Sequence, residues 1–118
     1  MLKGKKIVLG VTGGIAVYKA VDLVSKLRKE GADVRVVMTE SAAKFVTPLT
    51  FKEISGNTVA VSMWAEDQEF HVEHIALADW ADLMIIAPAT ANILAKAANG
   101  IADDLLSTVI LASKTPIV

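Results

Sequence analysis

The sequence predicts an α/β fold in which a parallel sheet carries helices on both faces. Three short apolar runs, rich in Val and Ile, occur at Lys5–Val11, Asp33–Met38 and Leu83–Ala87. Because they do not alternate with polar residues, they are typical of strands that are buried on both faces, as in parallel sheets. Segments with helical periodicity lie between and after these runs, as the connections of a parallel sheet require.

The first connection is a helix over Ala16–Glu30, with its apolar side chains on one face and most of its basic residues off that face. Gly31 ends this helix. After the second strand, Ser41–Phe45 predicts a short helix. Another helix starts at Thr47-Pro48, since proline fits the first helical turn, and ends at Ser55-Gly56-Asn57.

The second half of the chain carries further elements. Val59–Ser62 is a weaker strand candidate, and the polar segment Ala65–Gln68 is expected to be an exposed loop. Two helices are predicted over Asn92–Ala98 and Asp103–Ala112, and Pro116–Val118 looks like the beginning of another strand. We therefore expect one domain over residues 1–118 that is truncated at its C-terminus.

Length, charge and cysteine content exclude several classes of protein. The chain has 118 residues, which corresponds to one domain, and a net charge of −1 that gives no reason to expect nucleic acid. The absence of cysteine removes disulfides, thiolate metal sites and a cysteine nucleophile. No apolar run approaches the roughly 18 residues that span a bilayer, so a cytoplasmic protein is expected. The apolar fraction of 53% suggests contacts with other subunits.

A glycine turn, Gly10–Ile15 (GVTGGI), joins the first strand to the first helix. The free N–H groups and the helix dipole at such a turn point toward any bound anion. The spacing differs from G-x-G-x-x-G, and no G-K-[ST] follows, which excludes a P-loop. The second strand ends in Met38-Thr39 rather than in an acid, which disfavours NAD. A purely structural tight turn is the alternative.

Polar side chains also follow the second and third strands. Thr39 and Ser41 come after the second strand, and the APATAN loop, Ala87–Asn92, comes after the third. Open α/β sheets bind ligands at this carboxyl edge, so both sets are expected in one crevice. The hydroxyls of Thr39 and Ser41 suit a phosphate or a polar ring edge. Thr90 and Asn92 can hydrogen-bond a flat ring, and helix capping is the alternative role for all four.

His71 and His74 are the only histidines. A metal site fails on ligand count, because these two residues lie three positions apart outside a clear helix and the chain has no cysteine. His74 precedes the segment that leads into the third strand and its crevice loop. A neutral imidazole accepts protons near pH 7, so His74 is the candidate general base, and a histidine without chemistry is the alternative.

Other charged and aromatic residues have structural interpretations. Asp103 and Asp104 are expected to cap a helix start and to place negative charge there. Lys96 either approaches a phosphate or stays in solvent. Trp64 and Trp80 are expected to pack or to anchor an interface.

Three segments taken together resemble the homo-oligomeric flavin-containing cysteine decarboxylases. They carry the motifs GGIA from Gly13, HIxLxxWAD from His74 and APATAN from Ala87, and the resemblance covers essentially the whole chain. The combination is far more specific than any one motif. The similarity is closest to the amino-terminal phosphopantothenoylcysteine decarboxylase domains of bacterial bifunctional coenzyme A biosynthesis flavoproteins.

The resemblance implies a Rossmann-like (flavodoxin-like) domain that binds FMN rather than a dinucleotide, at the carboxyl edge and at contacts between subunits. The glycines would approach FMN, the hydroxyls after the second strand would bind its phosphate or ribityl region, and the APATAN residues would contact its ring or chain. By position, the implied FMN-binding residues are Gly13, Gly14, Ile15, Thr39, Ser41, Phe51, Thr90, Ala91 and Asn92.

The activity that the resemblance implies is FMN-dependent decarboxylation of 4'-phosphopantothenoylcysteine to 4'-phosphopantetheine, with His74 as the active-site base. A homotrimer or a dodecamer of trimers is implied as well. The family's PAMN-type substrate motif and its cysteine-bearing flap do not occur in the 118 residues. A flavin-binding oligomeric module without activity and a decarboxylase of another C-terminal cysteine stay open. The histidine of HIxLxxWAD argues against flavin prenyl transfer.

Overall fold

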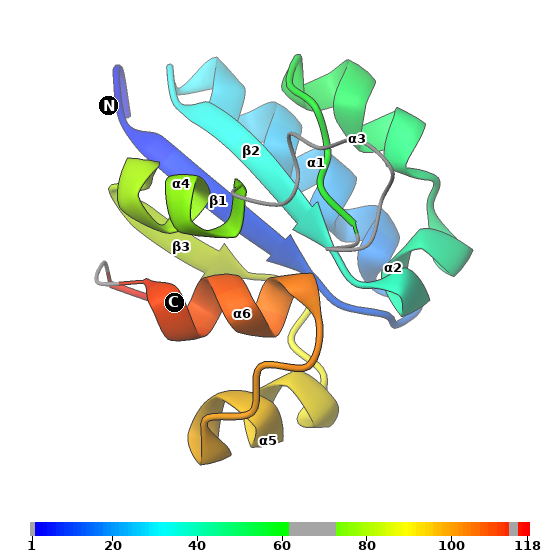
Figure 1. Ribbon diagram of the computed structural model, residues 1–118. Coiled ribbons are helices and arrows are strands. Elements are labelled where there is room, and N and C mark those ends of the chain that lie inside the picture. The colour runs from blue at the N-terminus through cyan, green and yellow to red at the C-terminus, as the bar shows by residue number, and fades with distance from the viewer. Residues whose placement is uncertain (1, 62–72, 114–115) are drawn as a thin grey trace.

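The computed structural model describes residues 2–61, 73–113 and 116–118, and the side chains of residues 73–76 lie outside that description. Three parallel strands form one sheet in the order β2-β1-β3, with helices on both faces (Figure 1). The strands are β1 (Lys6–Val11), β2 (Asp33–Met38) and β3 (Leu83–Ile86). The predicted α/β fold is confirmed, because each strand matches its predicted range to within one residue at either end.

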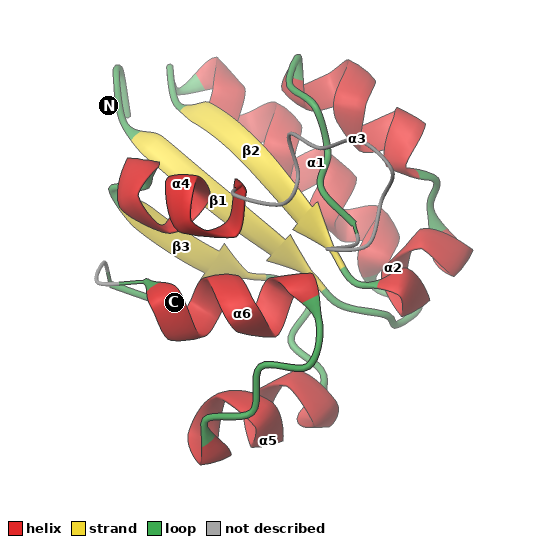
Figure 2. Cartoon of the chain, in the orientation of Figure 1, coloured by secondary structure: helices red, strands yellow, loops and turns green. Residues whose placement is uncertain are grey.

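The helices lie between and after the strands (Figure 2). They are α1 (Val17–Lys29), α2 (Glu40–Phe45), α3 (Pro48–Ser55), α4 (Glu73–Trp80), α5 (Ala91–Asn99) and α6 (Leu105–Ala112). Five of them match predicted helices, whereas α4 is not predicted, because apolar residues run almost without interruption through it and define no single face. Within the described ranges, no helix has the length and apolarity needed to cross a membrane.

Two short segments extend the sheet by single bridges. Ala60, in the weaker strand candidate, forms a parallel bridge with Val37, and the rest of that candidate forms no strand in the described part. At the other edge Ile117 forms a parallel bridge with Met84 of β3, in agreement with the predicted beginning of another strand at Pro116–Val118. The N–H of Met84 donates to the carbonyl of Pro116 at 3.0 Å. The predicted loop at residues 65–68 lies outside the described residues.

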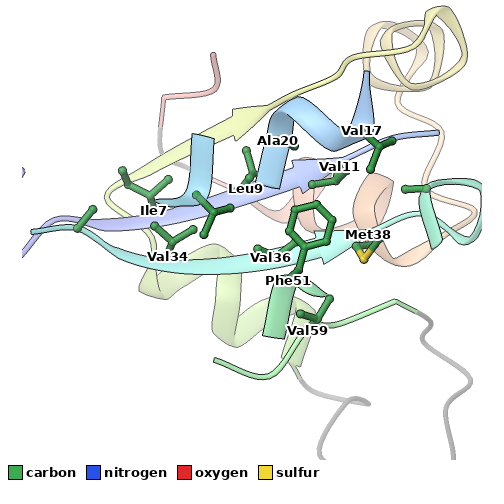
Figure 3. Packing of buried hydrophobic residues seen from close by; sticks show 13 residues of the cluster. Ile7, Leu9, Val11, Val17, Ala20, Val34, Val36, Met38, Phe51 and Val59 are labelled. Carbon is green, nitrogen blue, oxygen red and sulfur yellow. The ribbon is translucent and has the colours of Figure 1, made fainter. Parts of the chain in front are cut away.

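The side chains of the central strand β1 alternate between two apolar cores. Ile7, Leu9 and Val11 face a core that they share with α1, α3 and one face of β2 (Figure 3). Val8 faces a second core built with α4 and α6. On this second side the guanidinium carbon of Arg35 lies 4.6 Å from the centre of the Trp80 ring, so Trp80 packs against the sheet as predicted.

Glycines end two helices where the chain turns sharply. Gly31 and Gly56 have φ values of 95° and 74°, in the left-handed region that residues with a Cβ seldom adopt. A Cβ at Gly31 would also lie 2.9 Å from the Cα of Lys3. These turns lead the chain back from α1 into β2, and from α3 toward the bridge at Ala60, as the sequence predicts for both glycines.

Phe51, which the family resemblance implies as a flavin contact, lies in the core. Its side chain is 0% exposed and belongs to the same buried cluster as Val36 and Met38 (Figure 3). A ring without exposed surface has no route to a ligand outside the core. The structure therefore gives Phe51 a packing role between α3 and the sheet.

We predict that Phe51→Ala lowers the free energy of unfolding by about 3–5 kcal/mol, because it leaves a cavity in the core. Phe45→Ala is the matched control, since that ring is 56% exposed and its removal creates no internal cavity. Urea unfolding followed by circular dichroism measures both variants. Equal losses of stability for the two would contradict the packing role of Phe51.

Candidate functional site

Loops at the carboxyl ends of all three strands enclose a cavity of about 270 Å³. In a parallel sheet these ends meet at one edge, so segments that are distant in the chain come together there. The cavity is lined by Thr12, Gly13, Thr39, Ser41, Thr90, Asn92, Ile93 and Asp104. The glycine turn (residues 10–15) and the APATAN loop (residues 87–92) therefore converge, as the sequence predicts.

Thr12 joins the glycine turn to the APATAN loop. Its N–H donates to the carbonyl of Pro88 at 3.3 Å, and its hydroxyl donates to the same carbonyl. The hydroxyl oxygen also accepts from the N–H of Thr90 at 3.0 Å. Thr12 is not among the residues that the sequence motifs indicate, although a hydroxyl directly after a buried strand and next to Gly13 is a signal that could have identified it.

Gly13 and Gly14 have different reasons to be glycine. A Cβ at Gly13 would lie 2.5 Å from the Cβ of Ser41, so only glycine lets the turn pack directly on the start of α2. A Cβ at Gly14 would meet no atom within 4 Å. The backbone at Gly14 is therefore open to approach from outside the chain, as is the neighbouring Ile15 side chain, which is 83% exposed.

Thr39 and Thr90 cap the helices that begin at the cavity. Oγ1 of Thr39 accepts from the N–H of Ala42 at 3.1 Å, and Oγ1 of Thr90 accepts from the N–H of Ile93 at 3.2 Å. The capping interpretation is confirmed for both residues, and both also line the cavity.

The first turn of α5 offers further donors beside the cap. The N–H groups of Ala91 and Asn92 have no acceptor within an α-helix, because they belong to its first turn. Both residues are exposed, and the side chain of Asn92 lines the cavity. Backbone N–H groups at a helix start favour an anion or a polar oxygen. The structure thus places donors from the APATAN loop at the same cavity as the glycine turn.

A carboxylate also lines the cavity. Asp104 is the N-cap of α6, and its Oδ1 accepts from the N–H of Ser107 at 2.7 Å and from the Ser107 hydroxyl at 2.6 Å. Burial raises the pKa of Asp104, but the hydrogen bonds from Ser107 and the charge of Lys96 outweigh it, so the pKa lies below its ordinary value. Asp104 is therefore ionised at neutral pH, and its predicted capping role is confirmed.

Lys96 bridges the two aspartates before α6. Its Nζ lies 2.8 Å from Asp103 Oδ1 and 3.4 Å from Asp104 Oδ2, and its side chain is only 16% exposed. The hydrogen bond to Asp103 outweighs burial and raises the pKa of Lys96. The ammonium group of Lys96 therefore forms ion pairs with the two aspartates. Lys96 is not solvated as a free side chain, and it is not among the residues that line the cavity.

His74 lies in the first turn of α4, and its side chain is outside the described residues, as are His71 and Trp64. The N–H of Asp82, just after α4, donates to the carbonyl of Lys6 at 2.7 Å, at the start of β1. The helix therefore ends at the amino edge of the sheet. The first turn of α4 lies at the other end of the helix, which points toward the carboxyl edge of the sheet (Figure 1).

A three-stranded parallel sheet between helices, with a glycine turn and a ligand crevice at its carboxyl edge, defines a flavodoxin-like α/β protein. A model of one family of such proteins, described as "Flavoprotein", matches residues 1–118. The chain belongs to the flavoprotein family, in agreement with the resemblance that its three motifs carry.

Curated relatives of the chain are coenzyme A biosynthesis bifunctional proteins CoaBC. The protein of Bacillus subtilis (strain 168) is 53% identical over 117 residues, which is 99% of this chain and 29% of that protein. The protein of Haemophilus influenzae (strain ATCC 51907 / DSM 11121 / KW20 / Rd) is 54% identical over 116 residues, 98% of this chain and 29% of that protein. The chain thus spans 29% of the length of these relatives.

Three solved structures illustrate the similarity of the fold. The FMN-dependent cysteine decarboxylase SpaF gives a TM-score of 0.89 at 35% identity, over 99% of this chain and 67% of that one. The FMN-binding protein AtHal3 gives a TM-score of 0.79 at 31% identity, over 98% of this chain and 64% of the AtHal3 chain. A PPC decarboxylase mutant complexed with pantothenoylaminoethenethiol gives a TM-score of 0.76 at 30% identity, over 96% of this chain and 64% of the decarboxylase chain. The predicted flavodoxin-like fold is confirmed.

We predict that alanine substitutions separate the two glycines of the turn. Gly13→Ala forces a Cβ against Ser41 and should cost about 1–3 kcal/mol of unfolding free energy, as other overpacked sites do. Gly14→Ala meets open space and should change stability by no more than about 0.5 kcal/mol. Urea unfolding of both variants measures the difference, and a Gly14→Ala variant as unstable as Gly13→Ala would contradict these roles.

Proposed function

We propose that the chain binds FMN in the cavity and decarboxylates 4'-phosphopantothenoylcysteine in coenzyme A biosynthesis, giving 4'-phosphopantetheine. The observation that carries this proposal is the convergence of the glycine turn and the APATAN loop on one cavity. Identity of 53% to the coenzyme A biosynthesis protein CoaBC of B. subtilis, over 99% of the chain, supports the assignment of this reaction to coenzyme A biosynthesis. The similarity to a PPC decarboxylase structure at 30% identity also supports it.

The cavity fits the polar part of FMN. Backbone N–H groups of the turn and the hydroxyls of Thr39 and Ser41 are donors that suit a phosphate and the chain attached to it. Its volume of about 270 Å³ lies just below the range of about 300–1,000 Å³ that is usual for whole small ligands. We therefore expect it to receive part of FMN, with the flavin ring outside it near Gly14 and Asn92.

The protein's part in the reaction is to bind, to orient and to move a proton. Bound FMN would accept the two electrons that oxidation of the cysteine moiety releases before carbon dioxide leaves, and would return them to the resulting ene-thiol, so that 4'-phosphopantetheine forms without net oxidation. We assign the base to His74, because a neutral imidazole accepts a proton near pH 7. The first turn of α4, which carries His74, is directed toward the same edge of the sheet as the cavity (Figure 1).

The substrate has one alternative of the same chemical class. SpaF, at 35% identity, is an FMN-dependent cysteine decarboxylase, which supports a different molecule ending in cysteine. The higher identity to CoaBC proteins favours 4'-phosphopantothenoylcysteine. Supplying the chain with this compound and, separately, with a peptide that ends in cysteine distinguishes the two substrates.

We also propose that copies of the chain associate as a homotrimer or as larger assemblies of trimers. Several large apolar side chains are exposed in the described part: Ile15, Tyr18, Phe45, Leu49, Leu94, Ile101, Leu111, Ile117 and Val118. Exposed apolar surface of this kind is typical of surfaces that other subunits cover. Light scattering should give at least three times the monomer mass of 12.5 kDa, and a monomer at micromolar concentration would contradict the proposal.

The decisive experiment mixes the purified chain with FMN and 4'-phosphopantothenoylcysteine, and records the flavin spectrum and carbon dioxide release. The wild-type chain should turn yellow and release carbon dioxide. His74→Asn should keep the flavin but lose about 100-fold or more of the release rate, as expected for a lost general base.

His71→Asn is the matched control, because it removes the other histidine and should retain full turnover. Full turnover by His74→Asn would show that the base is a different group. A yellow wild-type chain that releases no carbon dioxide would favour a flavin-binding module, and a chain that binds no FMN would refute the proposal.

A further inference from the structure

Among the described residues that line the cavity, Asp104 alone carries a charged side chain. A carboxylate is unexpected in a cavity proposed to receive a phosphate, because like charges repel. The position of this charge therefore restricts how an anionic ligand can lie. A role for Asp104 in orienting FMN rests on the proposed FMN site and adds the direction in which the cofactor lies there.

The Asp104 carboxylate is held from two sides. Oδ1 accepts both hydrogen bonds from Ser107, and Oδ2 faces the Lys96 ammonium group at 3.4 Å. Three donors thus occupy three of the roughly four acceptor positions of a carboxylate. The side chain keeps 34% of its surface exposed and lines the cavity, so one acceptor position is left for a ligand.

The part of the cavity that Thr39 and Ser41 line has a different character. There the glycine turn packs against the start of α2, where a Cβ at Gly13 would touch Ser41. The lining side chains from that side, Thr39 and Ser41, are hydroxyls without charge. A phosphate is favoured at this neutral end, which offers donors, and is disfavoured beside Asp104.

We propose that Asp104 accepts a hydrogen bond from a hydroxyl of the ribityl chain of FMN and keeps the phosphate at the end formed by Gly13 and Ser41. An ionised carboxylate accepts hydrogen bonds but donates none, so a polyol chain matches it and a phosphate does not. Asp104 is then a specificity-determining residue for the flavin chain. Lys96 and Ser107 act as positioning residues that fix the carboxylate.

The test compares FMN with riboflavin, which has the same ribityl chain without the phosphate. Asp104→Asn preserves the cap of α6, since Asn and Asp are equally good N-caps, and removes the charge. Titration followed by flavin fluorescence should show affinity reduced by about tenfold or more for both ligands, with riboflavin affected at least as strongly as FMN.

Asp103→Asn is the matched control. Asp103 pairs with the same lysine, is 60% exposed and does not line the cavity, so its substitution should change both affinities by no more than about twofold. Circular dichroism melting checks that each variant is folded. If Asp104→Asn melts early, Asp104→Ser provides a second capping variant with a shorter side chain that has no carboxylate.

The outcomes separate this inference from the proposed function. Wild-type binding of FMN with unchanged affinities in Asp104→Asn would refute the role of Asp104 and leave the FMN site standing. A loss of FMN affinity without a loss for riboflavin would place the contact at the phosphate, and would also refute it. A wild-type chain that binds neither ligand would refute both proposals.

Discussion

The hydrogen bonds of Thr12 hold together the two loops on which the site depends. Its hydroxyl contacts the carbonyl of Pro88 and the N–H of Thr90, although 76 and 78 residues separate these partners from it in the chain. Thr12 is 1% exposed, so these bonds are made away from water, where leaving a polar group unpaired is costly. The pairing of β1 with β3 brings the loops close, and Thr12 fixes their relative position.

Around this link, three helices begin at the cavity with caps of different charge. Thr39 and Thr90 cap α2 and α5 with neutral hydroxyls, whereas Asp104 caps α6 with a carboxylate. A capping side chain satisfies N–H groups that would otherwise attract an anion. The cavity therefore has a charged side at α6 and a neutral side at α2, although all three residues serve the same local purpose.

Much of the fold could be predicted from the sequence, because both cores of the sheet need apolar runs and amphipathic helices. For example, the apolar run between Ala32 and Thr39 predicts β2 with the same first and last residues, Asp33 and Met38, as the structure has. The helix α4 could not be predicted in this way, since its apolar residues do not select one face. Motif positions did locate the cavity, but they carry no information on burial, which is why Phe51 was assigned to the ligand. Thr12 and the ion pairs of Lys96 depend on contacts between distant segments, which periodicity does not reveal.

Binding of FMN at the carboxyl edge is tested by titrating the ¹⁵N-labelled chain with FMN and following the amide chemical shifts. If FMN binds at the carboxyl edge of the sheet, the amides of Gly13, Gly14, Ala91 and Asn92 should shift most. The amides of Asp33 and Asp82, at the opposite edge beside the start of β1, should stay in place. Shifts concentrated at that opposite edge, or no shifts at saturating FMN, would contradict the account.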